Sequence, residues 1–293
     1  MSPAVPVRWY EPWPGSTAVP GPTLLWLHGG GFFRGGLDQP EAHDVARSLA
    51  ARGVRVATAD YRLAPPPGLG VAARRLMPTR ARYPAALDDV LAAYDEVGDR
   101  SPEGVVVGGA SAGACLAAAA TLRTIDEGRP PVGAVFAYGF FHARHPRVAQ
   151  RRHRSRGHRG LSHARWALDA TNRNYAGSAA AREERLAFPG GHALTGFPRT
   201  LVVTAERDNM RASGDLFATE LVGAGVEVRH DVLPGTRHAF LNRPGLAEFA
   251  HTVSLVADWS RRGAARPSSR RPSTASPAPS SGTVPAPPEV ASS

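Results

Sequence analysis

A serine set between two glycines is the most chemically informative feature of this 293-residue sequence. Ser111 lies in Gly109-Ala-Ser-Ala-Gly113, after an apolar run typical of a strand and before an alanine-rich helical segment. This is the pattern of a nucleophile elbow, a turn so tight that Cβ atoms at its outer positions would collide with adjoining backbone. It predicts a Ser111 hydroxyl that points out of a sheet, beside a helix N-terminus that favours negative charge. The alternative is a glycine-rich turn with an incidental serine.

A serine hydroxyl becomes a good nucleophile only when a base takes its proton and an acid orients that base. His238 follows a predicted strand in Gly235-Thr-Arg-His-Ala-Phe, and Asp208 follows another strand in Glu206-Arg-Asp-Asn. Both side chains are therefore expected at the sheet edge that carries Ser111. His238 could otherwise be a loop histidine without a role. Three further acids compete with Asp208 for this position: Glu206, Asp215 and Asp231.

A run of three glycines could supply donors for an oxyanion. The loop His28-Gly-Gly-Gly-Phe32 follows the apolar run 23–27, which is typical of a buried strand. Backbone N–H groups in such a loop are unhindered and can approach a developing negative charge closely. The run could merely be a flexible turn, but two motifs at compatible strand ends favour a shared site.

The elements that must position these residues alternate between strands and helices. An edge strand is predicted at 5–10, and further strands at 23–28, 54–59, 104–109, 132–138, 200–205 and 226–232. Helices are predicted at 83–97, 112–124, 211–222 and 244–261, and another near Asp38, with Glu41 at capping-box spacing and Gly53 at its end. This alternation predicts an α/β fold with a mostly parallel central sheet and helices on both faces.

The net charge of +10 comes from 35 arginines, because the sequence has no lysine. Residues 142–165 carry eight arginines and residues 261–293 carry five, which leaves the remaining chain slightly acidic. This distribution disfavours a uniformly basic nucleic-acid-binding protein. The single cysteine, Cys115, excludes an intrachain disulfide and is expected to be a small buried side chain. Without a signal-like or membrane-spanning apolar run, we expect a cytoplasmic protein.

The arginine-rich segment 142–165 has several possible roles. His142 and His145 have a spacing that suits a metal, but the segment holds no carboxylate or cysteine to complete the site, so no metal is expected. A solvated, flexible insertion is the leading interpretation, and an arginine-rich nucleic-acid adaptor is the alternative of another class. Arginines near the mouth of a site could also attract an acidic or phosphate-bearing ester.

Taken together, the motifs resemble the hormone-sensitive-lipase-like branch of the α/β-hydrolase esterases over residues 23–260. The matching segments are His28-Gly-Gly-Gly-Phe32, Asp60-Tyr-Arg-Leu-Ala-Pro65, Tyr83-Pro-Ala-Ala-Leu-Asp-Asp89, Gly109-Ala-Ser-Ala-Gly113, Asp208 and Gly235-Thr-Arg-His238-Ala-Phe. The resemblance implies a serine carboxylesterase that acts without a cofactor on small esters, with acyl chains of up to about eight carbons. It implies the triad Ser111, Asp208 and His238.

The resemblance also assigns supporting roles. Backbone N–H groups of Gly30, Gly31 and Ala112 would form the oxyanion hole. His28 would be a buried structural residue that holds the glycine loop, and the residues 60–62 would be scaffold beside the site. A deacetylase, amidase or acyltransferase that acts on a natural product would share the same intermediate, so these activities stay open. The sequence does not indicate an oligomeric state.

The chain departs from this family in several places. Only 27 residues precede the glycine loop, so we expect a reduced cap, with a lid at about 140–195. Residues 1–262 are predicted to form one α/β-hydrolase domain, and the Pro-, Ser- and Ala-rich residues 263–293 a disordered tail. Ala110 and Ala114 replace the aspartate and glycine that are common in the family's elbow. The stretch 66–82 is longer than usual, and its role is open.

Overall fold

The computed structural model describes residues 5–13, 21–68, 75–147, 154–155 and 157–262. Its central feature is a seven-stranded sheet with the strand order β1-β3-β2-β4-β5-β6-β7. β1 pairs antiparallel with β3, and every other pair is parallel. The strands are β1 (Val7–Tyr10), β2 (Thr23–Leu27), β3 (Val56–Ala59), β4 (Val105–Ala110), β5 (Gly133–Ala137), β6 (Thr200–Arg207) and β7 (Val228–Arg237). The predicted mostly parallel sheet with an edge strand at its start is confirmed.

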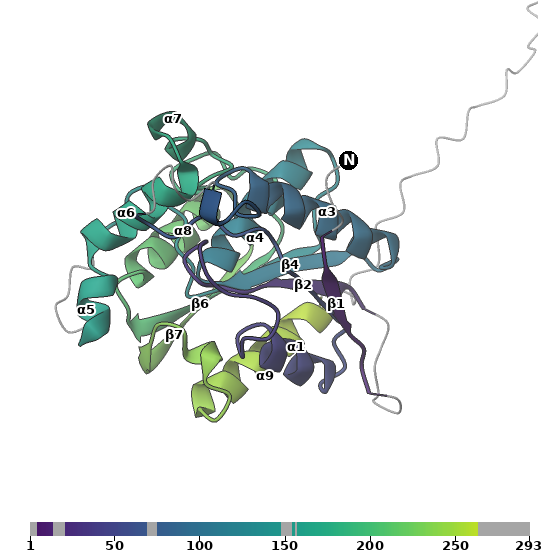
Figure 1. The fold of residues 1–293 in the computed structure, drawn as a ribbon. Coiled ribbons are helices and arrows are strands. Elements are labelled where there is room, and N and C mark those ends of the chain that lie inside the picture. Colours follow the sequence, from purple (N-terminus) through teal and green to yellow (C-terminus); the bar gives the residue numbers. More distant parts are fainter. Residues whose placement is uncertain (1–4, 14–20, 69–74, 148–153, 156, 263–293) are drawn as a thin grey trace, which may run out of the picture.

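Helices cover both faces of this sheet (Figure 1). The helices are α1 (His43–Ala50), α3 (Ala85–Asp99), α4 (Ala112–Asp126), α5 (His158–Ser162), α6 (Arg165–Ala176), α7 (Ala179–Arg182), α8 (Arg211–Gly223) and α9 (Ala247–Arg262), with a 3₁₀ turn η2 (Phe240–Asn242). α1 and α9 lie on one face, and α3, α4 and α8 lie on the other. Across the described ranges, no helix is long and apolar enough to cross a membrane.

The apolar runs of the strands are explained by burial on both faces. In β2, Leu25 and Leu27 pack into the core beneath α3, α4 and α8, whereas Leu24 and Trp26 pack into the core beneath α1 and α9. All four side chains are fully buried. Successive side chains of a strand point to opposite faces, so a strand covered on both sides needs an unbroken apolar sequence.

Several predicted boundaries shift. The predicted capping box at Asp38 and Glu41 is wrong, because α1 begins at His43 and no side chain caps it. α3 runs through Gly98 and ends at Asp99. β7 extends to Arg237, five residues beyond its predicted end, which places His238 directly after the strand. A register shift between Ala205 and Arg207 marks an irregularity where β6 pairs with β7.

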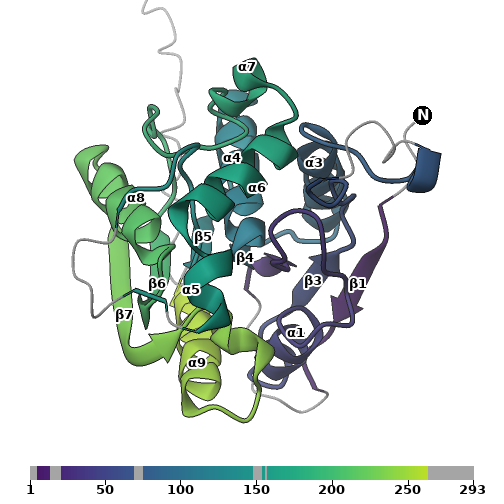
Figure 2. The ribbon, with the colours of Figure 1, turned by 60° about the vertical axis from the view of Figure 1, so that its left-hand side comes forward.

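The predicted lid region holds α5, α6 and α7. Both views show α6 and α7 on the side of the sheet that α3 and α4 cover (Figures 1 and 2). Asn172 joins α6 to the segment after β5, because its amide donates to the carbonyls of His142 and Ala143. From its sequence, the segment 142–165 is expected to be a solvated insertion. This expectation is wrong at His142 and His145, because both side chains are buried. The residues 148–153 and 156, and the predicted tail 263–293, lie outside the described residues.

Candidate active site

Ser111 occupies a strained turn between β4 and α4. Its φ of 53° and ψ of −118° lie outside the regions that residues other than glycine usually adopt. The turn also needs small neighbours. A Cβ at position 109 would lie 2.6 Å from the backbone of Gly113, and one at position 113 would overlap the carbonyl oxygens of Leu27 and His28. These close approaches explain the two glycines of the elbow.

Three side chains from three loops form one hydrogen-bonded chain. The Ser111 hydroxyl lies 3.0 Å from Nε2 of His238, and Nδ1 of His238 lies 2.6 Å from Oδ2 of Asp208. Ser111 and His238 are 5% and 6% exposed, and Asp208 is fully buried. The structure therefore brings together the serine, histidine and aspartate that the sequence singles out, each at the carboxyl end of a strand.

Asp208 is held in its charged form despite its burial. Desolvation by itself would raise the pKa of this carboxyl, but attraction to His238, its hydrogen bond, and the N–H of Met210 at 3.0 Å together lower it. The rival acids have other partners. Glu206 accepts from the N–H of Gly235, Asp215 pairs with Arg211, and Asp231 pairs with Arg229.

The glycine loop lies beside Ser111 and His238, and its backbone N–H groups are available as hydrogen-bond donors. Gly30 and Gly31 have φ values of 123° and 62°, which glycine adopts without strain. Among the described residues, no acceptor takes a hydrogen bond from the N–H groups of Gly30 and Gly31. Ala112 is the first residue of α4, so its N–H also has no partner within the helix.

Glu41 fixes the glycine loop in place. Its Oε1 accepts a hydrogen bond from the N–H of Gly29 at 2.6 Å, and its Oε2 accepts from the Tyr138 hydroxyl at 2.5 Å and the Asn242 amide at 3.0 Å. Glu41 is 1% exposed, so these bonds satisfy a buried carboxylate. The spacing to Asp38 had suggested a helix cap, and no local signal in the sequence indicates this role.

Tyr138 links Glu41 to the histidine. Its ring packs edge-on against the His238 ring, with centroids 5.0 Å apart, while its hydroxyl donates to Glu41. Tyr138 directly follows β5 with a φ of 38°, another strained conformation for a residue with a side chain. The glycine loop and the imidazole are therefore supported by one buried network.

His28 contacts the glycine loop, because its Nδ1 lies 2.8 Å from the carbonyl oxygen of Gly29. Its ring stacks on Tyr61 with centroids 4.4 Å apart, and the Tyr61 hydroxyl donates to the carbonyl of His28 at 2.6 Å. Burial lowers the pKa of His28, which favours the neutral ring. Arg62 forms a bidentate ion pair with Asp89 of α3, whereas Asp60 is exposed.

A cavity of about 500 Å³, the central cavity, opens onto Ser111 and His238. Gly30, Gly31 and Glu41 line it, together with residues of the predicted lid. His163 is one of these lid residues. Its Nδ1 lies 3.9 Å from Oδ1 of Asp208, and its ring packs edge-on against His238 at 4.9 Å. The described lid residues in the wall are Phe140, Ser162, His163, Leu168, Thr171 and Asn172.

The two histidines with metal-like spacing face different partners. His142 contacts the Ser213 hydroxyl at 2.7 Å and Glu220 at 3.1 Å, whereas His145 pairs with Asp169 at 3.6 Å. No group of three potential metal ligands occurs in the ranges that the structure covers. The pair therefore does not form a shared site there.

Two remaining sequence features are structural in this fold. Cys115 lies buried on α4, where burial raises the pKa of its thiol. In the stretch 66–82, Arg80 donates to the carbonyls of Phe33 and Ala64. Phe33 lines the central cavity, so Arg80 contacts the backbone of a residue in the cavity wall.

The chain resembles several known proteins in sequence and in fold. A protein family defined by its alpha/beta hydrolase fold matches residues 24–242. The carboxylesterase NlhH of Mycobacterium tuberculosis is 28% identical over 271 positions, covering 89% of this chain and 77% of NlhH. The ethyl acetate hydrolase of Pseudomonas putida is 30% identical over 257 positions, covering 84% and 74%. The structure of brefeldin A esterase, a bacterial homologue of human hormone sensitive lipase, aligns with a TM-score of 0.72 at 25% identity, covering 89% and 73%.

Proposed function

This chain belongs to the α/β-hydrolase-fold family, and from that premise we propose that it is a serine carboxylesterase whose catalytic residues are Ser111, His238 and Asp208. One observation carries the assignment of these residues. A buried hydrogen-bonded chain of serine, imidazole and carboxylate ends at a cavity that two glycines with free N–H groups also line. Nucleophile, base and oxyanion donors are thus available to one bound ester.

The first half of the reaction forms an acyl-enzyme. His238 Nε2 accepts the hydroxyl proton of Ser111 as Oγ attacks the ester carbonyl. The carbonyl oxygen becomes an oxyanion, which the N–H groups of Gly30, Gly31 and Ala112 stabilise. When the intermediate collapses, the bond to the alcohol breaks, and the His238 imidazolium returns its proton to the leaving alkoxide.

The second half restores the serine. A water molecule gives a proton to His238 and attacks the acyl carbonyl through the same oxyanion site. Collapse breaks the bond to Oγ, releases the carboxylic acid, and returns the proton to Ser111. Asp208 orients the ring through Nδ1 and stabilises its charge in both halves.

The acyl group is expected to be short to medium in length. One relative acts on ethyl acetate according to its name, and several others are named acetyl esterases, though those match over only 42% of this chain. A central cavity of about 500 Å³ lies within the range of small-molecule sites and has room for such an ester.

The test compares the native protein with Ser111→Ala on 4-nitrophenyl esters of increasing acyl length. Loss of the nucleophile is expected to lower kcat by about a thousandfold or more. Ser213→Ala is the matched control, because Ser213 also contacts a histidine but is fully buried in α8 away from the cavity. A transient mass increase on the native protein, equal to the acyl group, is expected by mass spectrometry. Equal rates for native and Ser111→Ala protein would refute the assignment.

A further inference from the structure

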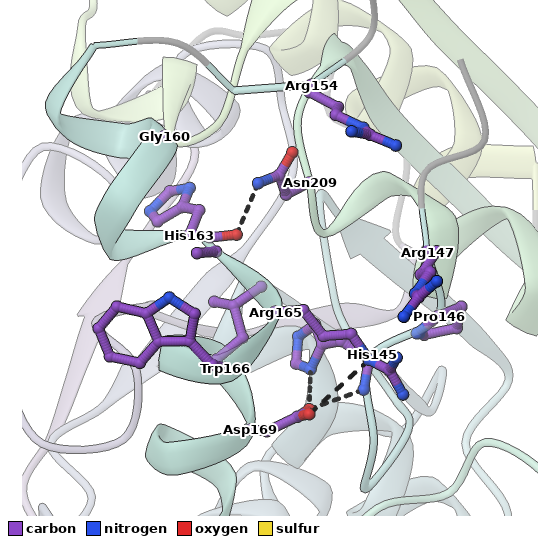
Figure 3. Close-up of a pocket in the computed structure, with 12 residues that line it drawn as sticks. His145, Pro146, Arg147, Arg154, Gly160, His163, Arg165, Trp166, Asp169 and Asn209 are labelled. Atoms are coloured by element: carbon purple, nitrogen blue, oxygen red, sulfur yellow. Dashed lines mark hydrogen bonds and ion pairs between the residues drawn. The ribbon is translucent and has the colours of Figure 1, made fainter. Parts of the chain in front are cut away.

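A second hollow adjoins the central cavity, and arginines dominate its charged lining. This arginine pocket has a volume of about 630 Å³ and lies between α5, α6 and the segment after β5 (Figure 3). Among the described residues of its lining, Arg147, Arg154 and Arg165 carry positive charge and Asp169 is the only carboxylate, so positive charge is in excess there.

The single carboxylate is already engaged. Asp169 accepts a hydrogen bond from the N–H of His145 at 2.9 Å, pairs with the ring of His145 at 3.6 Å, and lies 3.8 Å from Arg165. Arg147 forms no ion pair with any residue in the described ranges. Figure 3 shows the arginine side chains around one hollow, with Arg147 beside Pro146 and Arg165 extending toward Asp169. The pocket therefore keeps positive charge for a ligand.

The arginine pocket adjoins the central cavity, with which it shares lining residues. His163 and Leu168 line both the arginine pocket and the central cavity. His163 also packs on the His238 ring, and Asn209, the neighbour of Asp208, lines the arginine pocket and donates to the His163 carbonyl. A ligand in the arginine pocket therefore lies next to His163, which contacts the His238 ring and also lines the central cavity.

Part of the lining of the arginine pocket is apolar. Ala164, Leu168 and Trp166 contribute to it, and Trp166 is 68% exposed. Such a wall favours a hydrocarbon or aryl chain, whereas guanidinium groups bind carboxylates and phosphates through charged, often paired, hydrogen bonds. The two requirements describe one molecule with an apolar middle and an anionic end.

We propose that the arginine pocket is a substrate subsite for an anion, and that the preferred substrates are esters in which an apolar chain joins the scissile bond to a carboxylate or phosphate. This proposal rests on the proposed function, because it places the scissile bond at Ser111. The anion is held by Arg147, Arg154 and Arg165 while the carbonyl lies against the glycine loop.

The experiment measures selectivity with matched pairs of esters. One series carries the charge in the acyl half: the 4-nitrophenyl half-ester of adipic acid, the corresponding neutral monoamide, and a phosphate-ended analogue of equal length. A second series places it in the alcohol half, as acetylated 6-hydroxyhexanoate and its amide. The native protein is expected to give a higher kcat/KM for the anionic member of at least one pair. Comparing the carboxylate with the phosphate identifies the preferred anion.

The variants tie that preference to the pocket. In the double variant Arg147→Gln/Arg154→Gln, the anionic-to-neutral ratio of kcat/KM is expected to fall about three- to tenfold. Raising the salt concentration from about 0.05 to 0.5 M is expected to lower the ratio in the native protein in the same direction, because salt screens exposed charges. Arg144→Gln/Arg173→Gln is the matched control: it also removes two positive charges, one from the segment after β5 and one from α6, at residues outside the pocket lining.

The outcomes separate the two proposals. Turnover of the neutral esters without any anionic preference, or a preference that the double variant leaves intact, would overturn the subsite and leave the esterase standing. If no ester were hydrolysed, the proposed function would fall. In that case, calorimetric binding of the half-ester to Ser111→Ala protein, with and without the two arginine substitutions, still decides on the subsite. Equal affinities there would reject it.

Discussion

The carboxylate of Glu41 accepts a hydrogen bond from the backbone N–H of Gly29 at 2.6 Å, inside the protein and beside the loop proposed to bind the oxyanion. The same carboxylate accepts from Tyr138, whose ring packs against His238. Glu41 accepts hydrogen bonds from Gly29, Tyr138 and Asn242, and none of these bonds goes to Ser111. It acts as a positioning residue, because it fixes the direction in which the N–H groups of the next two glycines point.

Replacing Glu41 by glutamine is expected to lower kcat about 10- to 100-fold and to change KM much less. Glutamine keeps one acceptor for Gly29, but its amide NH₂ would meet the NH₂ of Asn242 where a carboxylate oxygen now accepts. The oxyanion donors would then be less well oriented, and their effect is largest in the transition state. Steady-state kinetics measures the split between kcat and KM.

Asp38→Asn is the control for Glu41, since Asp38 is the other half of the supposed capping box. Asp38 is exposed and pairs only with Arg8 among the described residues, so activity should remain close to that of the native protein. Thermal unfolding of both variants shows whether an effect on kcat comes from unfolding. An unchanged kcat in well-folded Glu41→Gln protein would contradict the positioning role.

Asp208→Asn is expected to lower kcat by about 10³- to 10⁴-fold, because an amide holds the imidazole in the wrong tautomer and does not stabilise its charge. Glu206→Gln and Asp215→Asn serve as controls. These acids competed with Asp208 in the sequence, but they contact Gly235 and Arg211 in the structure. The hydrolysis of a chromogenic ester ranks the three variants, and a larger loss in either control would assign the acid differently.

The pH dependence of stability should also report on Asp208. His238, the Met210 N–H and His163 outweigh burial and lower the pKa of this carboxyl in the folded protein. In an unfolded chain the pKa of aspartate is about 3.9. The stabilisation is therefore fully present above that value and is lost as pH falls through the lower, folded pKa. Urea unfolding at a series of pH values should show Asp208→Asn losing less stability on acidification than the native protein. If the stability of both proteins fell equally with pH, the lowered pKa of Asp208 would be contradicted.

Two glycine-to-alanine substitutions should change the free energy of unfolding in opposite directions. Gly113→Ala places a methyl group against the carbonyls of Leu27 and His28, so it is expected to destabilise the protein by about 3 kcal/mol or more. Gly98 lies within α3 and faces open space, so Gly98→Ala is expected to stabilise by about 0.5 to 1 kcal/mol. Denaturant unfolding measures both. A stable, active Gly113→Ala protein would show that the elbow is looser than this geometry requires.

Local sequence was sufficient for the framework of the fold. Apolar runs of strand length, separated by helical segments, predict the parallel sheet because each strand is buried on both faces. The glycines of the elbow at 109 and 113 can also be predicted from local sequence. A turn this tight excludes Cβ atoms at these two positions, whatever surrounds the domain. Asp208 and His238 can be found because strand ends of a parallel sheet share one edge.

Contacts between residues far apart in the sequence could not be predicted from local patterns. Glu41 and Asn242 are separated by 201 residues, and Tyr138 lies 97 residues from Glu41, yet all three meet beside the glycine loop. A glutamate three residues after an aspartate satisfies a helix-cap pattern equally well, so local spacing misidentified it. Likewise, His142 and His145 share a metal-like spacing, but α8 and α6 supply a separate partner to each.

The sequence by itself therefore determined the sheet, the turn that presents Ser111, and a short set of candidate partners at the strand ends, because short-range sterics and burial dictate these. Only the tertiary structure decided which acid meets His238 Nδ1, what supports the glycine loop, and that arginines from the loop after β5 and from α6 line one pocket beside the central cavity. Such arrangements depend on how distant elements pack, and hydrogen bonds and charges act over a few ångströms in space rather than along the chain.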